Sequence, residues 1–420
     1  MKVEKLEGTR DFYPPEMRFR NWLFQKMRYV SELYGYEEFD GPFLEKFDLY
    51  AAKSGEELAN EQTYVFNTRG ENPERIAVRP EMTPTLARMV AAKQNELRKP
   101  LRWFTIPNVW RYERAQRGRK REFYQWNIDI LGVETMDADA EILAVSIALL
   151  ASLGLQKGEF VVRLSNRYYL EDLLKRLGVD LSLKEGVYRQ IDRIEKLKPE
   201  DFRANLQELG LSAETVAQLE QALRERNYQD FGPLKELWER LEDYGIADYV
   251  EFDPSIVRGL LYYTGTVFEV WDPTKKFTRA IMGGGRYDGL VEVLGGQPLP
   301  AVGTAISDVV LEEMLKQQGK MPKLERELDV FVARYSPNER RQSIAVAQQL
   351  RQAGLKVELG VLGNSMDKQL KAANNSGAKF AVIVAPAELE RGEVNLKNLQ
   401  TRAQQTVKLE ALVAAIQNEL

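Results

Sequence analysis

The chain has 420 residues and contains no cysteine and no histidine. Disulfides, thiolate or imidazole metal sites and imidazole catalysis are therefore excluded, and any chemistry must use carboxylates, cations, phenols and bound ions. A content of 44% hydrophobic and 29% charged residues, with a formal net charge of −4, predicts a globular protein of two or three domains. No apolar run is long enough to span a bilayer, and the N-terminus lacks a signal peptide's apolar core, so we expect a cytoplasmic protein without membrane attachment.

The first third of the chain predicts a helix and then extended segments. Apolar residues recur at helical spacing between Pro15, near the start, and Gly35, which ends the pattern. Four extended segments follow, at 62–66, 75–78, 101–114 and 122–134. The last two are apolar, rich in β-formers and joined by AQRGRKR, which predicts an antiparallel hairpin with a basic tip.

The middle of the chain changes composition. From about 168 to 246, Leu, Glu, Lys and Arg recur at helical spacing, which predicts a helical insertion. Strands are expected again at 249–252, 264–271 and 278–283, and the last one ends in the glycine-rich GGGRYDGL.

A second boundary is expected in a polar segment around Pro322. Beyond it, strands and helices alternate, which predicts a small α/β domain with a largely parallel sheet over about 328–420. Residues 320–420 hold 15 Lys and Arg against 11 Asp and Glu, a net charge of +4. This excess is compatible with RNA contact, although a solvated surface is the more common explanation of so small a value.

The hairpin tip holds the strongest concentration of charge. The fifteen residues RYERAQRGRKREFYQ contain six basic and two acidic side chains. Charge runs usually form solvated surface. The alternative is that Arg111 and an arginine of the tip clamp a triphosphate, because guanidinium groups bind phosphate oxygens bidentately. Glu113, which lies between them in the sequence, could accept a hydrogen bond from the amino group of adenine.

Three other segments give weaker signals in isolation. RPEMT at 79–83 supplies Glu81 and Thr83 after a strand, a pattern most often found at helix caps. Asp129 lies in the apolar strand WNIDILG, where an acid is costly unless it is paired or solvated, and the pattern alone favours a solvated face. GGGRYDGL lacks the spacing of a phosphate-binding P-loop.

Taken in order, these segments resemble the histidyl-tRNA synthetases, a family of class II aminoacyl-tRNA synthetases. RGLLYYTGTVFE at 258–269 resembles the family's histidine-binding signature, and GGRYDG resembles its partner segment. RPEMT, the hairpin from Arg111 to Gln125 as motif 2, the Pro42 region as motif 1 and PAVGTAI as the start of motif 3 follow the family order. The resemblance covers nearly the whole chain.

The resemblance implies an α+β class II catalytic domain over 1–322, with an antiparallel sheet flanked by helices and the helical insertion at about 168–246. It also implies a C-terminal α/β anticodon-binding domain over 328–420. The expected activity is that of a histidine–tRNA ligase, which uses ATP and Mg²⁺ to convert histidine to histidyl-adenylate and then transfers it to the 3′ end of tRNA(His). A homodimer formed through motif 1 is implied as well.

The same resemblance assigns roles to individual residues. Arg258 and Arg111 would be catalytic, stabilising the negative charge that gathers at the carboxylate of histidine and the α-phosphate of ATP. Since that carboxylate is already a nucleophile, the reaction needs no general base. ATP would be bound by Arg111, Glu113 and Arg119 or Arg121, histidine by Glu81, Thr83, Gln125, Asp129, Tyr262 and Tyr263, and the acceptor end of tRNA by Arg114 and Gln116.

The sequence departs from the family pattern at three positions. Leu261 stands where many members carry an acid, Val310 stands where motif 3 usually ends in an arginine, and motif 2 ends in FYQ instead of FHQ. An alternative is a non-catalytic regulatory subunit of ATP phosphoribosyltransferase in histidine biosynthesis. Such proteins typically lack the C-terminal domain and have eroded ATP and histidine signatures, whereas this chain has the C-terminal domain and recognisable signatures. RGLLYYTG disfavours class II enzymes for threonine, proline or glycine.

Overall fold

The computed structural model describes residues 3–51, 57–114, 116–257, 262–277, 279–360 and 365–420. The chain divides into two compact units, one made of Met1–Phe12 and Arg20–Met321 and the other of Tyr13–Phe19 and Pro322–Leu420. The division after Met321 falls in the polar segment around Pro322. The domain limits expected from the sequence, 1–322 and 328–420, stay predictions.

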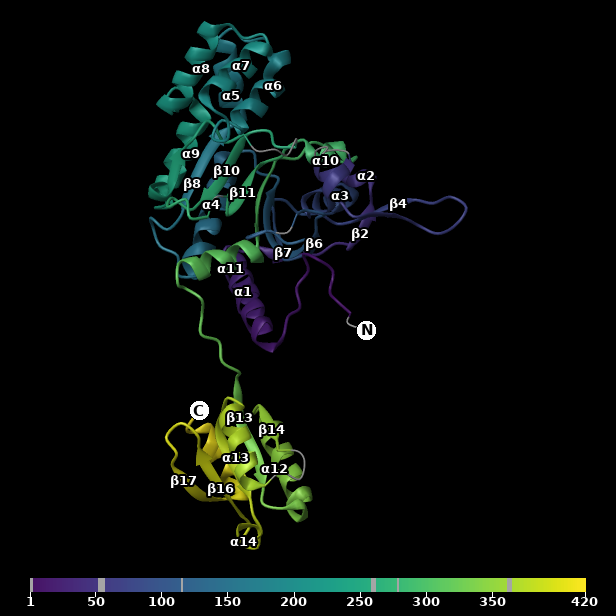
Figure 1. Cartoon of the computed structure of the whole chain (residues 1–420), viewed down its shortest axis with the longest axis vertical. Helices are drawn as coiled ribbons and strands as arrows, with labels where there is room; N and C mark the ends of the chain where they lie inside the picture. Colours follow the sequence, from purple (N-terminus) through teal and green to yellow (C-terminus); the bar gives the residue numbers. More distant parts are fainter. Residues whose placement is uncertain (1–2, 52–56, 115, 258–261, 278, 361–364) are drawn as a thin grey trace. The chain divides into compact units, whose positions relative to one another are not determined.

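The first unit is built on a mainly antiparallel sheet (Figure 1), with strand order β1-β5-β7-β12-β11-β10-β8-β9 and β6 paired with β7. Among the described strands of this sheet, only the edge pairs β1–β5 and β8–β9 are parallel. The strands are β1 Glu37–Glu38, β5 Leu101–Thr105, β6 Asn108–Trp110, β7 Glu122–Leu131, β8 Val161–Asn166, β9 Val250–Phe252, β10 Thr266–Trp271, β11 Met282–Arg286 and β12 Ala301–Ser307. The predicted hairpin and antiparallel sheet are confirmed.

Helices cover this sheet. The helix predicted between Pro15 and Gly35 is confirmed as α1. It buries Leu23, Met27 and Val30, and Gly35 follows its end with φ +76°, a conformation that favours glycine. Helices α4 and α11 contact β7 and β12, the two central strands that carry much of the site described below. The helices outside the insertion are α1 Pro14–Leu33, α2 Asp48–Ala51, η1 Glu57–Gln62, α3 Thr83–Lys93, α4 Met136–Ser152, α10 Leu290–Val293 and α11 Asp308–Gln317.

The predicted insertion is confirmed as helical: α5 to α8 lie beyond one end of β8 in Figure 1, whereas α9 packs against α4. Leu219, Leu223, Leu234 and Leu237 are buried in it, as expected from apolar residues at helical spacing. Its helices are α5 Arg167–Arg176, η2 Leu181–Leu183, α6 Lys184–Asp192, α7 Pro199–Glu208, α8 Ala213–Glu225, α9 Gly232–Asp243 and η3 Ala247–Tyr249.

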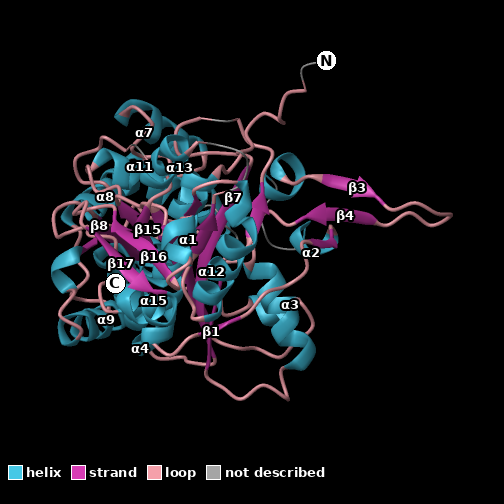
Figure 2. Ribbon diagram, turned by 90° about the horizontal axis from the view of Figure 1, so that it is seen from below, coloured by secondary structure: helices cyan, strands magenta, loops and turns pink. Residues whose placement is uncertain are grey.

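A small antiparallel sheet of β2 Leu44–Lys46, β4 Arg75–Val78 and β3 Val65–Asn67, in that order, belongs to the same unit. Figure 2 shows β3 and β4 side by side and extending away from the neighbouring elements. The apolar residues Phe43, Leu44, Val65 and Phe66 are exposed here, at 42%, 45%, 38% and 46%.

Two strand predictions were misplaced. The segment expected at 62–66 begins as β3 only at Val65, because Gln62 ends the π-helix η1 and its carbonyl oxygen accepts a hydrogen bond from the Tyr112 N–H. The strand expected at 278–283 is β11, which starts at Met282 and contains the three glycines. Glycine is a poor strand former, but here β10 and β12 pair with β11 on both sides and supply the backbone partners.

The second unit contains a five-stranded sheet, in the order β14-β13-β15-β16-β17, and helices that pack against it. The parallel part is confirmed for β14, β13 and β15, whereas β16 and β17 are antiparallel, so the sheet is mixed rather than largely parallel. The connections 385–392, which holds the short helix α14, and 399–403 are both shorter than a parallel crossover requires, so the last strands reverse direction. The elements are β13 Leu328–Arg334, η4 Pro337–Glu339, α12 Arg340–Gln352, β14 Val357–Leu359, α13 Met366–Asn375, β15 Ala378–Val384, α14 Pro386–Leu389, β16 Glu393–Asn398, β17 Gln404–Lys408, η5 Leu409–Ala411 and α15 Leu412–Gln417.

Candidate active site

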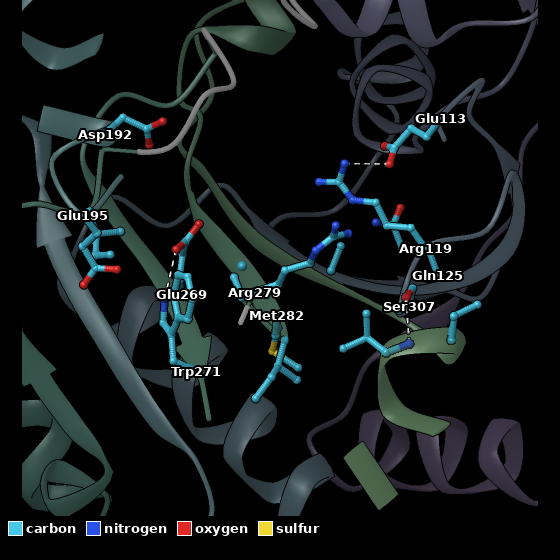
Figure 3. Close-up of a pocket in the computed structure, with 18 of the residues that line it drawn as sticks. Glu113, Arg119, Gln125, Asp192, Glu195, Glu269, Trp271, Arg279, Met282 and Ser307 are labelled. Atoms are coloured by element: carbon cyan, nitrogen blue, oxygen red, sulfur yellow. Dashed lines mark hydrogen bonds and ion pairs between the residues drawn. The ribbon is translucent and has the colours of Figure 1, made fainter. Parts of the chain in front are cut away.

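A cavity of about 650 Å³ lies in the first unit. Its walls come from the hairpin tip and β7, from β10 and β11, from the end of β12 with the start of α11, and from the segment that follows α6 of the insertion. The volume is within the range of small-molecule sites. Figure 3 shows the carboxylates of Asp192, Glu195 and Glu269 on one side, with Arg279 and Arg119 toward the other.

Arg111 lines the cavity and is held by its surroundings. Its Nε donates to the carbonyl oxygen of Pro80 at 2.9 Å, and its guanidinium carbon lies 5.5 Å from the centre of the Phe123 ring. These contacts fix the side chain, and the two Nη groups are the donors that can fork onto a phosphate.

Glu113 and Arg119, which the sequence assigns to different ends of ATP, are paired with each other here. Arg119 Nη1 lies 3.0 Å from Glu113 Oε2, and both residues line the cavity. The predicted adenine acceptor therefore holds one of the predicted phosphate-binding cations. A nucleotide that uses both groups has to separate this ion pair.

Arg121 does not line the cavity. Its Nε donates to the Glu113 carbonyl oxygen at 3.2 Å, its guanidinium stacks on the Tyr112 ring at 4.6 Å, and its Nη2 lies 3.6 Å from Glu7. Of the two tip arginines between which the sequence left the choice open, Arg119 is the one at the cavity.

Arg114 and Gln116, expected near the acceptor end of tRNA, are exposed at the hairpin tip. A backbone bridge between Gln116 and Arg119 closes the turn, and Gly118 within it has φ +71°. A Cβ on Gly118 would lie 2.8 Å from the Phe277 ring, so the tip packs closely on the segment that leads into β11.

Gln125 lines the cavity from β7, where it is paired in register with Ser307 of β12. Its Oε1 is buried and has no hydrogen-bond partner within the described part of the chain. A buried acceptor without a partner is costly, and a ligand N–H would remove that cost. Residues 125 and 129 lie four apart in a strand, so their side chains share one face of the sheet.

A second group of buried residues, which we term the tyrosine–acid cluster, is made of Glu81, Asp129, Tyr262, Tyr263 and Tyr287. The Tyr262 hydroxyl donates to Glu81 Oε2 at 2.9 Å, and the Tyr262 ring packs against Tyr263 and Tyr287 with centroids 5.0 and 6.0 Å apart. Burial, strengthened by the charge of Glu81, raises the pKa of Tyr262 well above its ordinary value, so the phenol stays protonated and able to donate.

Asp129 is buried, at 4% exposure, so the solvated position that its strand pattern favours is wrong. The Tyr287 hydroxyl donates to Asp129 Oδ1 at 2.6 Å. Burial raises the pKa of Asp129 to about 7, and the Tyr287 hydrogen bond partly opposes this effect. The carboxyl therefore titrates near neutrality.

Glycines make room for this cluster. A Cβ on Gly303, the register partner of Asp129, would lie 1.9 Å from Asp129 Oδ1. A Cβ on Gly285 would lie 3.0 Å from Tyr263 Cδ1 and 2.5 Å from a backbone oxygen. The GGGR run thus provides space beside the cluster and does not form a phosphate-binding loop.

The remaining assigned residues fall into three cases. Thr83 begins α3, directly after the segment that carries Glu81. Val310 lines the cavity, and its N–H donates to Ser307 Oγ at 3.2 Å as part of the cap of α11. Arg258 and Leu261 lie outside the described residues.

Several residues at the site were not predicted from the sequence, among them Tyr287, Glu269 and Arg279. Tyr287 lies within GGGRYDGL, and a phenol directly after a strand was a usable signal. Arg279 lines the cavity, but a single basic residue in a loop gives no signal in the sequence.

Comparison with known proteins agrees with this geometry. The family described as histidyl-tRNA synthetase matches residues 8–309, and an anticodon-binding domain matches 329–419. The chloroplastic/mitochondrial histidine–tRNA ligase of Arabidopsis thaliana is 40% identical over 98% of this chain and 86% of its own length. The histidine–tRNA ligase of Leptospira biflexa is 36% identical over 100% and 98%.

A solved structure shares the fold. The histidyl-tRNA synthetase from Nostoc sp. PCC 7120 superimposes with a TM-score of 0.80 at 25% identity, covering 100% of both chains. The motif order is the one that the resemblance predicts, and the relatives align along nearly the full length. The chain therefore belongs to the histidyl-tRNA synthetase family.

Proposed function

We propose that the cavity binds ATP and that the tyrosine–acid cluster binds the side chain of histidine. The chain is a histidine–tRNA ligase, an aminoacyl-tRNA ligase of protein synthesis that uses ATP. The observation that carries the site assignment is the gathering of Arg111, Glu113, Arg119 and Gln125 around one cavity. The family resemblance assigns these same residues to ATP and histidine.

Activation is proposed to proceed by direct displacement. A carboxylate oxygen of histidine attacks the α-phosphorus, the bond from that phosphorus to the oxygen bridging to the β-phosphate breaks, and pyrophosphate leaves with the electron pair. No proton is transferred, so a site without histidine residues can perform the step. Arg111 is proposed to stabilise the α-phosphate as charge develops, and Arg258 keeps the same role as a prediction.

Histidine recognition is proposed to use buried acids. Asp129 would accept the imidazole N–H and Glu81 the α-amino group, with Gln125 and Thr83 beside them. A substrate without the N–H donor would forgo this hydrogen bond to a buried carboxylate, which gives discrimination. One oxygen of each acid already accepts a hydrogen bond from a tyrosine hydroxyl, so the substrate replaces or shares existing hydrogen bonds.

Mg²⁺ is proposed to enter with the nucleotide. The ion is commonly held by substrate phosphates and one or two carboxylates, and Glu269 supplies oxygen donors at the cavity wall. When bound, the ion would neutralise part of the phosphate charge.

Transfer to tRNA is proposed to engage both units. The match to an anticodon-binding domain over 329–419 supports tRNA contact by the second unit. The exposed Arg114 and Gln116 are proposed to contact the acceptor end, and tRNA(His) is the expected substrate.

A homodimer is proposed to form through the small sheet of β2, β4 and β3. Its exposed side chains Phe43, Leu44, Val65 and Phe66 support this, because exposed apolar side chains gathered on one small sheet favour an interaction surface. Phe43 and Leu44 directly follow Pro42, the segment assigned to motif 1. Sedimentation of the wild type and of Phe66→Asp tests it, and a monomeric wild type would contradict it.

The regulatory-subunit alternative is less well supported, because the anticodon-binding domain that such proteins typically lack is matched here. No described helix is both long enough and apolar enough to cross a bilayer. The cytoplasmic location stays a prediction, to be checked by cell fractionation.

The decisive experiment is ATP–pyrophosphate exchange measured with each of the twenty amino acids. Exchange with histidine alone is expected. Exchange with none of them would remove the catalytic assignment and favour the regulatory subunit. Exchange with another amino acid would contradict the proposed roles of Asp129 and Glu81.

A further inference from the structure

Arg279 is a cavity residue that none of the roles above uses. Its Nη1 is buried and has no hydrogen-bond partner among the residues that the structure describes. Figure 3 shows its guanidinium end pointing across the cavity toward Arg119. A guanidinium always carries its charge at neutral pH, so its buried donors call for an anion.

The electrostatic surroundings of Arg279 show which anion would fit. Burial and the charge of Arg119 both lower the pKa of Arg279, and Glu113 partly opposes them. Two like charges therefore face each other, and the only carboxylate named among these influences, Glu113, is already paired with Arg119. A polyanion placed between the two guanidinium groups would remove their repulsion and pair the buried donor.

The backbone on both sides of Arg279 is anchored. Asp272, at 2% exposure, accepts hydrogen bonds from Thr274 and from the Phe277 N–H, and Phe277 in turn packs against Gly118 of the hairpin tip. On the other side, the Ile281 N–H donates to the Val270 carbonyl oxygen at 2.7 Å. The anchoring presents a long, flexible side chain at a defined place on the wall.

Another part of the cavity wall lacks a cation where the motif order leads one to expect it. Val310 lines the same cavity and offers packing but no charge. We propose that Arg279 binds the outer phosphates of ATP, and the pyrophosphate that leaves, together with Arg119. This assignment rests on the proposed function, because it takes the cavity to be the ATP site.

The test compares Arg279→Ala with wild type for ATP, AMP and inorganic pyrophosphate. Binding is measured by calorimetry and turnover by ATP–pyrophosphate exchange with histidine. Loss of a charge-assisted contact should weaken ATP and pyrophosphate by roughly ten- to a hundredfold. AMP affinity and the KM for histidine should stay unchanged, since neither ligand carries outer phosphates.

Two further variants keep the result interpretable. Lys276→Ala removes one positive charge from an exposed position in the same loop and should leave all three affinities unchanged. Arg279→Lys keeps the charge and should recover part of the ATP affinity, which also covers the case in which the alanine variant misfolds.

The outcomes separate the inference from the function. Absence of exchange in the wild type would refute the ligase assignment itself. Normal exchange in the wild type with equal ATP affinity in Arg279→Ala would overturn the role of Arg279 alone. Equal weakening of ATP and AMP would place Arg279 at the nucleoside or α-phosphate and would also overturn it.

Discussion

In the cavity, Arg279 and Gln125 carry buried polar atoms without hydrogen-bond partners among the described residues, whereas in the tyrosine–acid cluster Asp129 and Glu81 accept hydrogen bonds from tyrosines. In the cavity, buried polar atoms are thus left open to a ligand, whereas in the cluster one oxygen of each acid already accepts a hydrogen bond from a tyrosine hydroxyl. The difference matches the two substrates. A triphosphate supplies its own dense charge, whereas a small amino acid must be distinguished from nineteen others by the arrangement of a few acceptors.

The largest effect is expected when the cavity loses Arg111. Arg111→Ala should lower the rate of ATP–pyrophosphate exchange by roughly a hundredfold or more, because the charge it neutralises is greatest in the transition state. Histidine binding, measured by calorimetry, should not change. Arg117→Ala serves as control, since Arg117 is exposed and paired with Glu313 away from the cavity. A matching loss of histidine affinity would mean that the two regions do not act separately.

The complementary change is Asp129→Asn in the cluster. It should weaken histidine by roughly ten- to a hundredfold, because the amide can present its N–H to the imidazole N–H. ATP binding should be retained. Tyr287→Phe, which removes only the hydroxyl that donates to Asp129, is the matched comparison and should not reproduce the loss. Unchanged histidine affinity in Asp129→Asn would remove Asp129 from the binding site.

The pH dependence of the same pair sharpens the comparison. With a pKa of about 7, Asp129 is mainly protonated at pH 6 and mainly ionised at pH 8. The ratio of wild-type to Asp129→Asn affinity should therefore rise by roughly tenfold over that range, since only the carboxylate accepts the substrate N–H. Titration of histidine itself cancels in the ratio. A flat ratio would contradict an acceptor role for the ionised group.

Gly303→Ala tests whether the cluster depends on missing side chains. The new methyl group would overlap Asp129 Oδ1, so we expect a loss of about 1–3 kcal/mol in the free energy of unfolding, together with weaker histidine binding. Gly289→Ala is the control, because no heavy atom lies within 4 Å of the added methyl group and its φ is −85°. Urea denaturation of both variants provides the measurement. Equal stability would show that Asp129 can move away at little cost.

The smallest effect is expected for Glu113→Gln. Removing the carboxylate releases Arg119 and lowers the negative charge of the wall, so pyrophosphate should bind more tightly by about 0.5 kcal/mol, or roughly twofold. Glu313→Gln breaks the comparable pair with Arg117 outside the cavity and should change nothing. Weaker pyrophosphate binding in Glu113→Gln would show that the pair holds Arg119 in place for the phosphates.

The sequence predicts the fold well wherever periodicity is strong. The first helix, the hairpin around Arg111–Gln125 and the insertion all follow from local patterns. The glycine strand β11 could not be located accurately, because its existence depends on pairing with β10 and β12 rather than on its own residues. The start of the strand predicted at 62–66 was also misplaced, because a π-helix has no recurring sequence pattern that would mark its end at Gln62.

Only those site residues that lie within recognisable motifs could be predicted from the sequence. Motif order brought Arg111, Glu113 and Asp129 into consideration, but it could not distinguish Arg119 from Arg121. Arg119 and Arg121 lie two apart, and in a regular strand their side chains would share one face of the sheet. Here, however, the backbone bridge between Gln116 and Arg119 closes a turn, and the Arg121 N–H donates to the Gly8 carbonyl oxygen. The burial of Asp129 and the position of Arg279 arise from strands and loops distant in sequence, which no local pattern encodes.

The Glu113–Arg119 ion pair has a consequence for ionic strength. Because the Arg119 side chain is 48% exposed, dissolved salt weakens this internal pair as well as the attraction between ATP and the cavity. Screening therefore lowers the cost of opening the pair while it lowers the gain from the phosphates. The affinity for ATP should consequently depend less steeply on salt than the number of cations lining the cavity would suggest.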